Sequence, residues 1–230
     1  MPGREMDPSM VGGGRIVSVN VGHRRPRRRA TARLTAIDKL PVDRVDVRDP
    51  GPKRGGLGSG VVGDEIGDQR HHGGRLQAVY AYAAEDLHWW AGELGRPLTP
   101  GLFGENLTTE GLDLTGAVIG ETWVVGGAVL RVEVPRIPCA TFAEQLDEPR
   151  WVSRFTEAGR TGAYLSVVIP GSVAVGDEVR VQRPDHDLDL LVLFRAFGGD
   201  LDALRRVVDA RVIDAEVQAD LEEDLARRQA

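Results

Sequence analysis

Residues 117–139 read AVIGETWVVGGAVLRVEVPRIPC, and this stretch decides the fold class. Short apolar runs at 117–119, 122–125 and 128–134 are separated by glycine-containing turns. Short strands joined by glycine turns are typical of a β barrel or a β sandwich. No part of the chain alternates strands with long helices, as a doubly wound sheet requires. The sequence therefore predicts a mainly β, α+β fold with a barrel-like core.

The flanking sequence extends this pattern on both sides. Apolar periodicity predicts strands at 15–21, 164–169 and 178–182 and helices at 78–94 and 151–158. Residues 31–47 are predicted as strand, turn, strand, with the turn at Pro41.

Three regions follow from these patterns. Residues 1–14 are polar and Gly-rich and contain all three methionines, so we expect a disordered leader and an uncertain start codon. Residues 15–185 form the β-barrel-like domain. In residues 186–230 the apolar residues recur at helical spacing, which predicts a cap of two or three short helices.

Composition limits the function classes. The chain has 230 residues, 41% of them hydrophobic, and a net charge of -6, so we expect no attraction to nucleic acid or to anionic membranes. We expect no signal peptide and no transmembrane span, because no apolar run is long enough. The single cysteine excludes an intramolecular disulfide and a four-cysteine cluster, and it favours a cytoplasmic location.

Two conspicuous loops are interpreted as ordinary surface. His23–Arg29 is strongly basic, but a short basic run in an acidic chain is more often a solvated loop than a nucleic-acid site. Gly-rich residues 51–60 lack the Gly-Lys-Ser/Thr ending of a phosphate loop, so we expect a flexible surface loop.

Cys139 is the leading candidate for chemistry. It follows a predicted strand and the two prolines Pro135 and Pro138, which predict a stiff, non-helical turn. Arg136 is three residues away and would favour the thiolate, a soft metal ligand and a good nucleophile. A buried structural cysteine is the competing interpretation.

Two polar clusters complete the candidate site. Residues 63–75 contain His71 and His72, which point to opposite faces of an extended chain and are poor joint ligands for zinc. The pair Glu105-Asn106 lies between glycine turns and either orients a loop or contacts a ligand.

Taken in order, these segments resemble the MOSC domain family, named for the C-terminal domain of molybdenum cofactor sulfurase. The resemblance is closest to its stand-alone bacterial YiiM-like branch and covers about residues 15–183, with the tail resembling that branch's three-helix extension. The matching segments are Thr35–Val42, 63–74, Gly101–Gly111, Pro135–Cys139 and Gly159–Leu165.

The resemblance implies a molybdenum–molybdopterin cofactor (Moco) with Cys139 as the metal ligand. It also implies candidate cofactor-binding residues, namely Lys39, His72, Arg75, Asn106, Arg136 and Arg160. Known members reduce N-hydroxylated compounds such as hydroxylaminopurines and amidoximes. Glu105 or His72 is then the candidate proton donor.

The same resemblance implies what surrounds the chain. A separate reductase would supply electrons, and no pyridoxal phosphate site is expected. A homodimer is left open. Three alternatives remain: a sulfur carrier with a Cys139 persulfide, a cofactor-storage module without turnover, and a molybdenum-independent Cys–His hydrolase.

Overall fold

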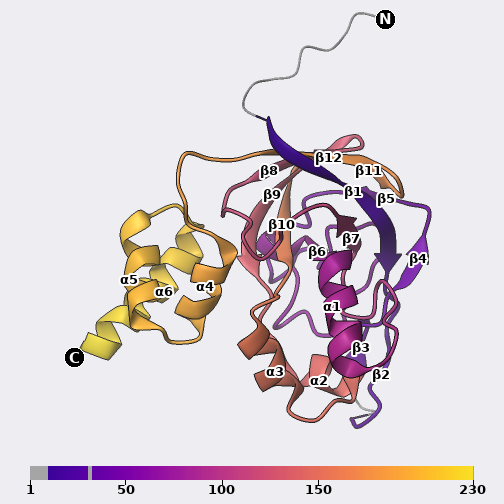
Figure 1. The fold of residues 1–230 in the computed structure, drawn as a ribbon, viewed down its shortest axis with the longest axis horizontal. Helices are drawn as coiled ribbons and strands as arrows, with labels where there is room; N and C mark the ends of the chain where they lie inside the picture. Colours follow the sequence, from indigo (N-terminus) through magenta and orange to yellow (C-terminus); the bar gives the residue numbers. More distant parts are fainter. Residues whose placement is uncertain (1–9, 31–32, 230) are drawn as a thin grey trace, which may run out of the picture.

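The computed structural model describes residues 10–30 and 33–229, and a closed β barrel forms its centre (Figure 1). Seven strands close into a ring because the strand that is first along the chain, β1 (Met10–Val21), also pairs with the strand that is last along the chain, β12 (Glu178–Gln182). In ring order these are β1, β7 (Leu107–Glu110), β6 (Val79–Ala83), β10 (Ala163–Ile169), β9 (Ala128–Pro135), β8 (Thr122–Val125) and β12. The β6–β7 pair is parallel and the other neighbours are antiparallel. The predicted α+β fold with a barrel-like core is confirmed.

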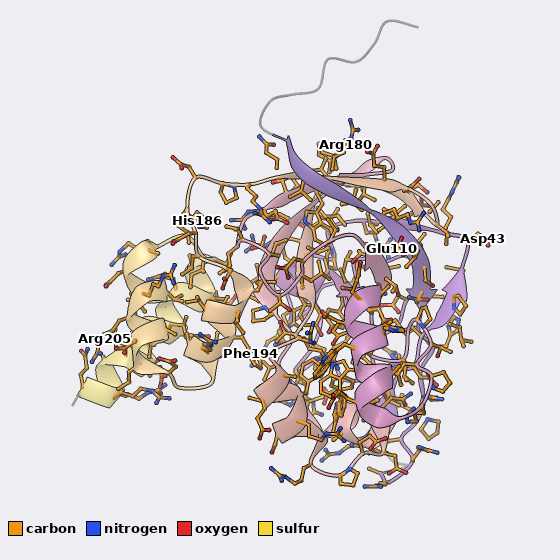
Figure 2. The ribbon with its side chains drawn as sticks, viewed as in Figure 1. Asp43, Glu110, Arg180, His186, Phe194 and Arg205 are labelled. Atoms are coloured by element: carbon orange, nitrogen blue, oxygen red, sulfur yellow. The ribbon has the colours of Figure 1, made fainter. Side chains whose placement is uncertain are left out.

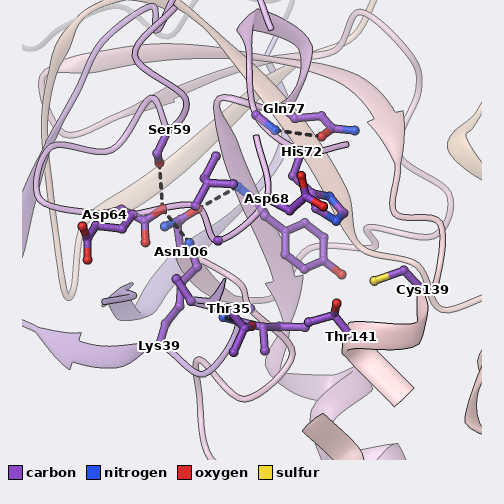
Figure 3. Close-up of a pocket in the computed structure, with 18 of the residues that line it drawn as sticks. Thr35, Lys39, Ser59, Asp64, Asp68, His72, Gln77, Asn106, Cys139 and Thr141 are labelled. Atoms are coloured by element: carbon purple, nitrogen blue, oxygen red, sulfur yellow. Dashed lines mark hydrogen bonds and ion pairs between the residues drawn. The ribbon is translucent and has the colours of Figure 1, made fainter. Parts of the chain in front are cut away.

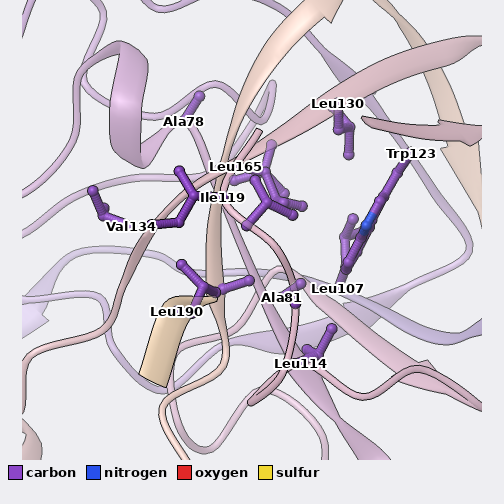
Figure 4. Close-up of a cluster of buried hydrophobic side chains, with 14 of the residues drawn as sticks. Ala78, Ala81, Leu107, Leu114, Ile119, Trp123, Leu130, Val134, Leu165 and Leu190 are labelled. Atoms are coloured by element: carbon purple, nitrogen blue, oxygen red, sulfur yellow. The ribbon is translucent and has the colours of Figure 1, made fainter. Parts of the chain in front are cut away.

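The barrel interior is filled by apolar side chains from alternate positions of its strands. In β9, Leu130 and Val132 are fully buried while Arg131 between them points outward. Trp123, Leu107 and Leu165 are also fully buried in this cluster (Figure 4). The predicted strands at 122–125 and 128–134 are confirmed because their alternation matches the pleat of a sheet.

Residues 117–119 do not form the predicted strand. The Ile119 N–H donates to the Leu188 carbonyl and the Leu190 N–H donates to the Ala117 carbonyl, so this run pairs with the segment that leads into the cap. Only one isolated bridge, between Val118 and Asp189, results.

Five shorter strands of the described chain lie outside the ring. They are β2 (Arg25–Pro26) with β3 (Leu34–Thr35), β4 (Leu40–Val42) on β1, and β5 (Arg44–Val47) with β11 (Gly171–Ala174). Pro41 is not the predicted turn, because it lies inside β4 opposite Asn20. Proline is tolerated there since β4 is an edge strand. β1 begins at Met10, earlier than the predicted leader boundary, and residues 1–9 of that leader lie outside the described residues.

Three helices cover one end of the barrel: α1 (Ala84–Leu94), α2 (Ala140–Leu146) and α3 (Trp151–Ala158). The helix predicted over 78–94 is wrong in its first part, where every residue of β6 is buried between its neighbours β7 and β10. The helix at 151–158 is confirmed. Aromatic side chains join the three helices in a second core containing Trp90, Phe103, Phe142, Trp151 and Phe155.

The C-terminal cap consists of α4 (Leu190–Phe197), α5 (Leu201–Ala210) and α6 (Ala215–Gln229), and it lies beside the barrel (Figure 1). Its buried leucines, including Leu190 and Leu204, belong to the same apolar cluster as the barrel. The 3-10 turn η1 (Arg75–Gln77) is joined to the cap by an ion pair between Arg75 and Asp214. Among residues 10–30 and 33–229, no helix combines the length and apolar character needed to cross a membrane.

Candidate functional site

Cys139 lies at the start of α2, directly after the irregular segment that leaves β9. Its backbone is extended, with φ -131° and ψ 169°, and it serves as the N-cap residue of the helix. The Cys139 carbonyl accepts a hydrogen bond from the Ala143 N–H. The side chain is half-buried, so the thiol is held by a rigid helix start yet reachable from solvent.

Two hollows meet at this thiol. An inner pocket of about 100 Å³ runs from Cys139 toward Asp64 and Lys39 (Figure 3). A wide outer cleft of about 1520 Å³ lies on the other side, between the barrel and the cap. Cys139, His72 and Tyr164 line both. The inner pocket is too small for a cofactor-sized ligand, whereas the outer cleft has ample room.

Arg136 places a positive charge in the wall of the inner pocket. Its guanidinium carbon lies 5.1 Å from the centre of the Tyr80 ring and 4.4 Å from that of Phe142. Nη1 donates to the Tyr164 hydroxyl at 3.5 Å, while the buried Nε has no hydrogen-bond partner. Arg136 is 5% exposed, and no carboxylate of the described chain pairs with it. A buried, unpaired cation of this kind favours an anionic ligand in the pocket.

The surroundings of Cys139 favour its thiolate. Burial raises the pKa of the thiol, but a hydrogen bond with His72, the charge of Arg136 and the Phe142 N–H together lower the pKa to about 6. The thiol is therefore largely ionised at neutral pH, which suits a soft metal ligand or a nucleophile.

Lys39 is already engaged by a carboxylate. Its ammonium lies 2.7 Å from Asp64 Oδ2, which also accepts from the Ser59 hydroxyl at 2.7 Å. Asp64 Oδ1 accepts from the Gly22 N–H at 2.7 Å. Burial lowers the pKa of Lys39, with the charge of Asp64 opposing that change. Lys39 lines the inner pocket but offers it little free charge.

In the Glu105-Asn106 pair, Asn106 lines the inner pocket and Glu105 lies behind it. Glu105 is fully buried, is not part of the pocket lining, and accepts from the Gly101 and Phe103 N–H groups. Burial raises its pKa to about 7 against these hydrogen bonds. Asn106 Oδ1 accepts from the Tyr80 N–H, and its Nδ2 donates to the Asn20 carbonyl. Glu105 therefore does not line the inner pocket, and its expected role as a proton donor stays a prediction.

The two remaining candidate arginines, Arg75 and Arg160, lie in different places. Arg75 lines the outer cleft and is paired with Asp214 of the cap at 2.9 Å. Arg160 lines neither hollow, because it forms an ion pair with Asp86 and stacks over Trp89 at 4.6 Å. The structure thus brings Cys139, Arg136 and His72 together and leaves Arg160 apart.

Sequence reasoning missed part of the lining. Tyr164, Thr141 and Gln77 face the hollows, and the side-chain Oε1 of Gln77 accepts from the Gly73 N–H at 3.1 Å. Tyr164 lies in a quoted motif, whereas Thr141 and Gln77 carry no local signal.

The Gly-rich loop 51–60 is also part of the site. It packs against the histidine segment, since the Gly74 N–H donates to the Gly58 carbonyl, and its residues Pro52 and Lys53 border the outer cleft. It is a wall of the site rather than only the surface loop that was predicted.

Comparisons with known proteins agree with this architecture. The family model described as the MOSC domain matches residues 68–180. The uncharacterized protein YflK of Bacillus subtilis is 38% identical over 114 residues, and the protein YiiM of Escherichia coli is 31% identical over 118 residues. These alignments cover 50% of this chain, and 52% and 53% of the relatives. The chain therefore spans about half the length of the curated relatives it matches.

Solved structures extend the likeness across the fold. The crystal structure of YiiM from Geobacillus stearothermophilus superposes with a TM-score of 0.71 and 28% identity, covering 92% of this chain and 99% of that one. The YiiM structure from Escherichia coli gives a TM-score of 0.69 at 21% identity, which supports the fold alone. With its barrel, its cap and its matched central segment, this chain belongs to the MOSC domain family and is of the YiiM type.

Proposed function

We propose that this chain holds a molybdenum–pterin cofactor through Cys139 and reduces N-hydroxylated compounds such as hydroxylaminopurines and amidoximes. The observation that carries the proposal is the position of Cys139. Its thiol, with a pKa of about 6, lies where a cation-lined inner pocket meets a wide cleft. MOSC family membership supports the choice of cofactor.

The residues present fit this cofactor. A thiolate is a soft ligand suited to molybdenum, and the unpartnered Nε of Arg136 can bind an anionic group of the cofactor. Among the residues described, no three His, Cys, Asp or Glu side chains group into a metal site, so the cofactor itself would supply the other metal ligands. Arg75 and Asn106 line the hollows and are further candidates, whereas Arg160 lies away from them.

The overall reaction consumes two electrons and two protons and converts an N–OH group to N–H and water. When bound, molybdenum supplies the oxygen-accepting redox chemistry. His72 is the protein group best placed to hold or move a proton, because it lines both hollows and contacts the Cys139 thiol. Electrons would come from a separate reductase, since the single cysteine of this chain builds no iron–sulfur cluster. A reducing cytoplasm suits the proposal because Cys139 must remain a free thiol.

A sulfur carrier is the second candidate, favoured by the same accessible thiolate. In that case Cys139 would carry a persulfide and the protein would bind no molybdenum. The two functions differ in what co-purifies with the chain, so one preparation distinguishes them.

The test is to express the wild type, Cys139→Ser and Thr141→Ser in a host that makes the cofactor. Molybdenum by mass spectrometry, pterin by fluorescence and sulfane sulfur are measured for each protein. We expect molybdenum and pterin in the wild type and in Thr141→Ser, with molybdenum lost in Cys139→Ser. Reduction of a hydroxylaminopurine by the loaded protein, with a reduced viologen as donor, then tests the reaction. Sulfane sulfur without molybdenum would instead support the carrier.

A further inference from the structure

A second basic hollow opens beside the outer cleft. It has a volume of about 610 Å³, and we call it the arginine hollow after four of its lining residues, Arg24, Arg27, Arg33 and Arg70. Arg27, Arg33 and Arg70 also line the outer cleft, and Thr141 lines all three cavities. The arginine hollow is therefore continuous with the cleft that exposes Cys139.

The charges of this hollow are only partly compensated. Arg27 is paired with Glu144 at 2.5 Å, and the Arg24 side chain donates to the Ile66 carbonyl. Within the described residues, the guanidinium groups of Arg33 and Arg70 have neither an ion pair nor a hydrogen-bond partner. The one acid in the lining, Asp68, accepts from the backbone N–H of Arg70.

These four arginines gather around one hollow although the chain as a whole carries a net charge of -6. Free guanidinium groups around a concave surface match the geometry of a phosphate, which they bind through paired N–H donors. Because the hollow is concave, it suits a small anion better than it suits the surface of an acidic partner protein.

We propose that the arginine hollow binds the phosphate of a phosphorylated substrate, through Arg33 and Arg70, while the rest of that substrate extends into the cleft toward Cys139. The substrate class would then be N-hydroxylated nucleoside phosphates. The assignment of the substrate class rests on the proposed function, whereas the assignment of the phosphate site does not. The phosphate takes no part in the reaction, so the site contributes binding and orientation only.

Calorimetry with adenosine 5′-monophosphate and adenosine tests the site, because these probes differ only by the phosphate. The double variant Arg33→Gln/Arg70→Gln is compared with Arg44→Gln/Arg180→Gln, which removes the same charge elsewhere. Arg180 lies at the top of the view in Figure 2, away from β2 and β3 at the bottom of Figure 1. Cofactor-free and cofactor-loaded proteins are both titrated, and the pterin content of each variant is measured.

We expect the monophosphate to bind at least about tenfold more tightly than adenosine, and this advantage to disappear in Arg33→Gln/Arg70→Gln but not in the control. Equal binding of the two probes, or an unchanged advantage in the double variant, overturns the proposal. The cofactor's own phosphate is the other source of the same chemistry. If the monophosphate binds only to the cofactor-free protein, and the double variant loses pterin, the hollow binds the cofactor's phosphate. That result would overturn the substrate assignment.

The two proposals fail separately. If the chain never retains molybdenum, the titration of the cofactor-free protein still decides whether the phosphate site exists. If the loaded protein reduces the hydroxylaminopurine, the KM of its ribonucleoside monophosphate should be about tenfold lower than that of the ribonucleoside, with a similar kcat. Loss of this difference in Arg33→Gln/Arg70→Gln supports the proposal, and equal KM values in the wild type contradict it.

Discussion

The guanidinium carbon of Arg136 lies 4.4 Å from the centre of the Phe142 ring, and these two residues stand three positions on either side of Cys139. The ring holds the cation in place, and the Phe142 N–H and the Arg136 charge both lower the pKa of the Cys139 thiol. One short segment therefore carries the thiol and two of the groups that ionise it.

In the cofactor-free protein, alkylation of Cys139 by iodoacetamide should reach half its maximal rate near pH 6, because the thiolate is the nucleophile and the pKa is about 6. Arg136→Met removes a nearby cation and should move this midpoint to higher pH. Mass spectrometry of the labelled protein measures the rate. Cys139→Ser should not be labelled, since the chain has one cysteine, and a wild-type midpoint near the ordinary 9.0 would contradict the expectation.

Lys39→Met should lower the free energy of unfolding by about 3–5 kcal/mol, because it leaves the buried Asp64 carboxylate without its counter-ion. Combining it with Asp64→Asn should recover part of the loss. Urea denaturation of the single and double variants measures the coupling. Lys53→Met, at an exposed lysine, is the control and should stay within about 0.5 kcal/mol of the wild type. An equally small effect of Lys39→Met would show that the buried pair is not stabilising.

Glu105→Gln should change how stability depends on pH. In the folded chain burial raises the Glu105 pKa from 4.5 to about 7, so between these values the unfolded state has released a proton that the folded state keeps. This carboxyl therefore lowers the free energy of unfolding as pH rises through that window, by about 3 kcal/mol, with no further change above it.

The glutamine variant should be less stable than the wild type at acidic pH, because its amide group cannot accept from both the Gly101 and Phe103 N–H groups. The difference in the free energy of unfolding between the two proteins should narrow as pH rises to about 7. Denaturation of both proteins across this range measures it, with the exposed Glu93→Gln as control. A gap that does not vary with pH would mean that Glu105 is ionised throughout.

Gly73→Ala should destabilise the contact between the Gly-rich loop and the histidine segment. A Cβ at Gly73 would lie 2.7 Å from the Gly58 carbonyl oxygen, and the φ of +87° is strained for alanine. Gly63 has the same φ with open space around it, so Gly63→Ala pays the backbone strain alone. We expect Gly73→Ala to lose a further 1–3 kcal/mol or so, and also to retain less pterin because His72 is displaced. Thermal unfolding and pterin content of the two variants provide the comparison, and equal losses would rule out the close approach.

Local pattern was sufficient for much of the barrel. The strands at 122–125 and 128–134 were predictable because glycines bound them and apolar residues alternate along one face. β6 was not, because both of its faces are covered and its sequence, VYAYA, is buried at every position. Its neighbours β7 and β10 come from distant parts of the chain, and their pairing overrides the helical spacing that continues into α1.

The sequence by itself determined the family, the barrel-like core and the choice of Cys139, because a unique thiol between strand, prolines and helix is a local signal. It did not distinguish among the cations Lys39, Arg75, Arg136 and Arg160. The tertiary structure decided that three of them are neutralised by acids 25, 139 and 74 positions away, namely Asp64, Asp214 and Asp86. Arg136 alone of the four keeps a buried charge without a carboxylate partner among the described residues. Charge compensation depends on which distant segments the fold brings into contact, and no local pattern records that.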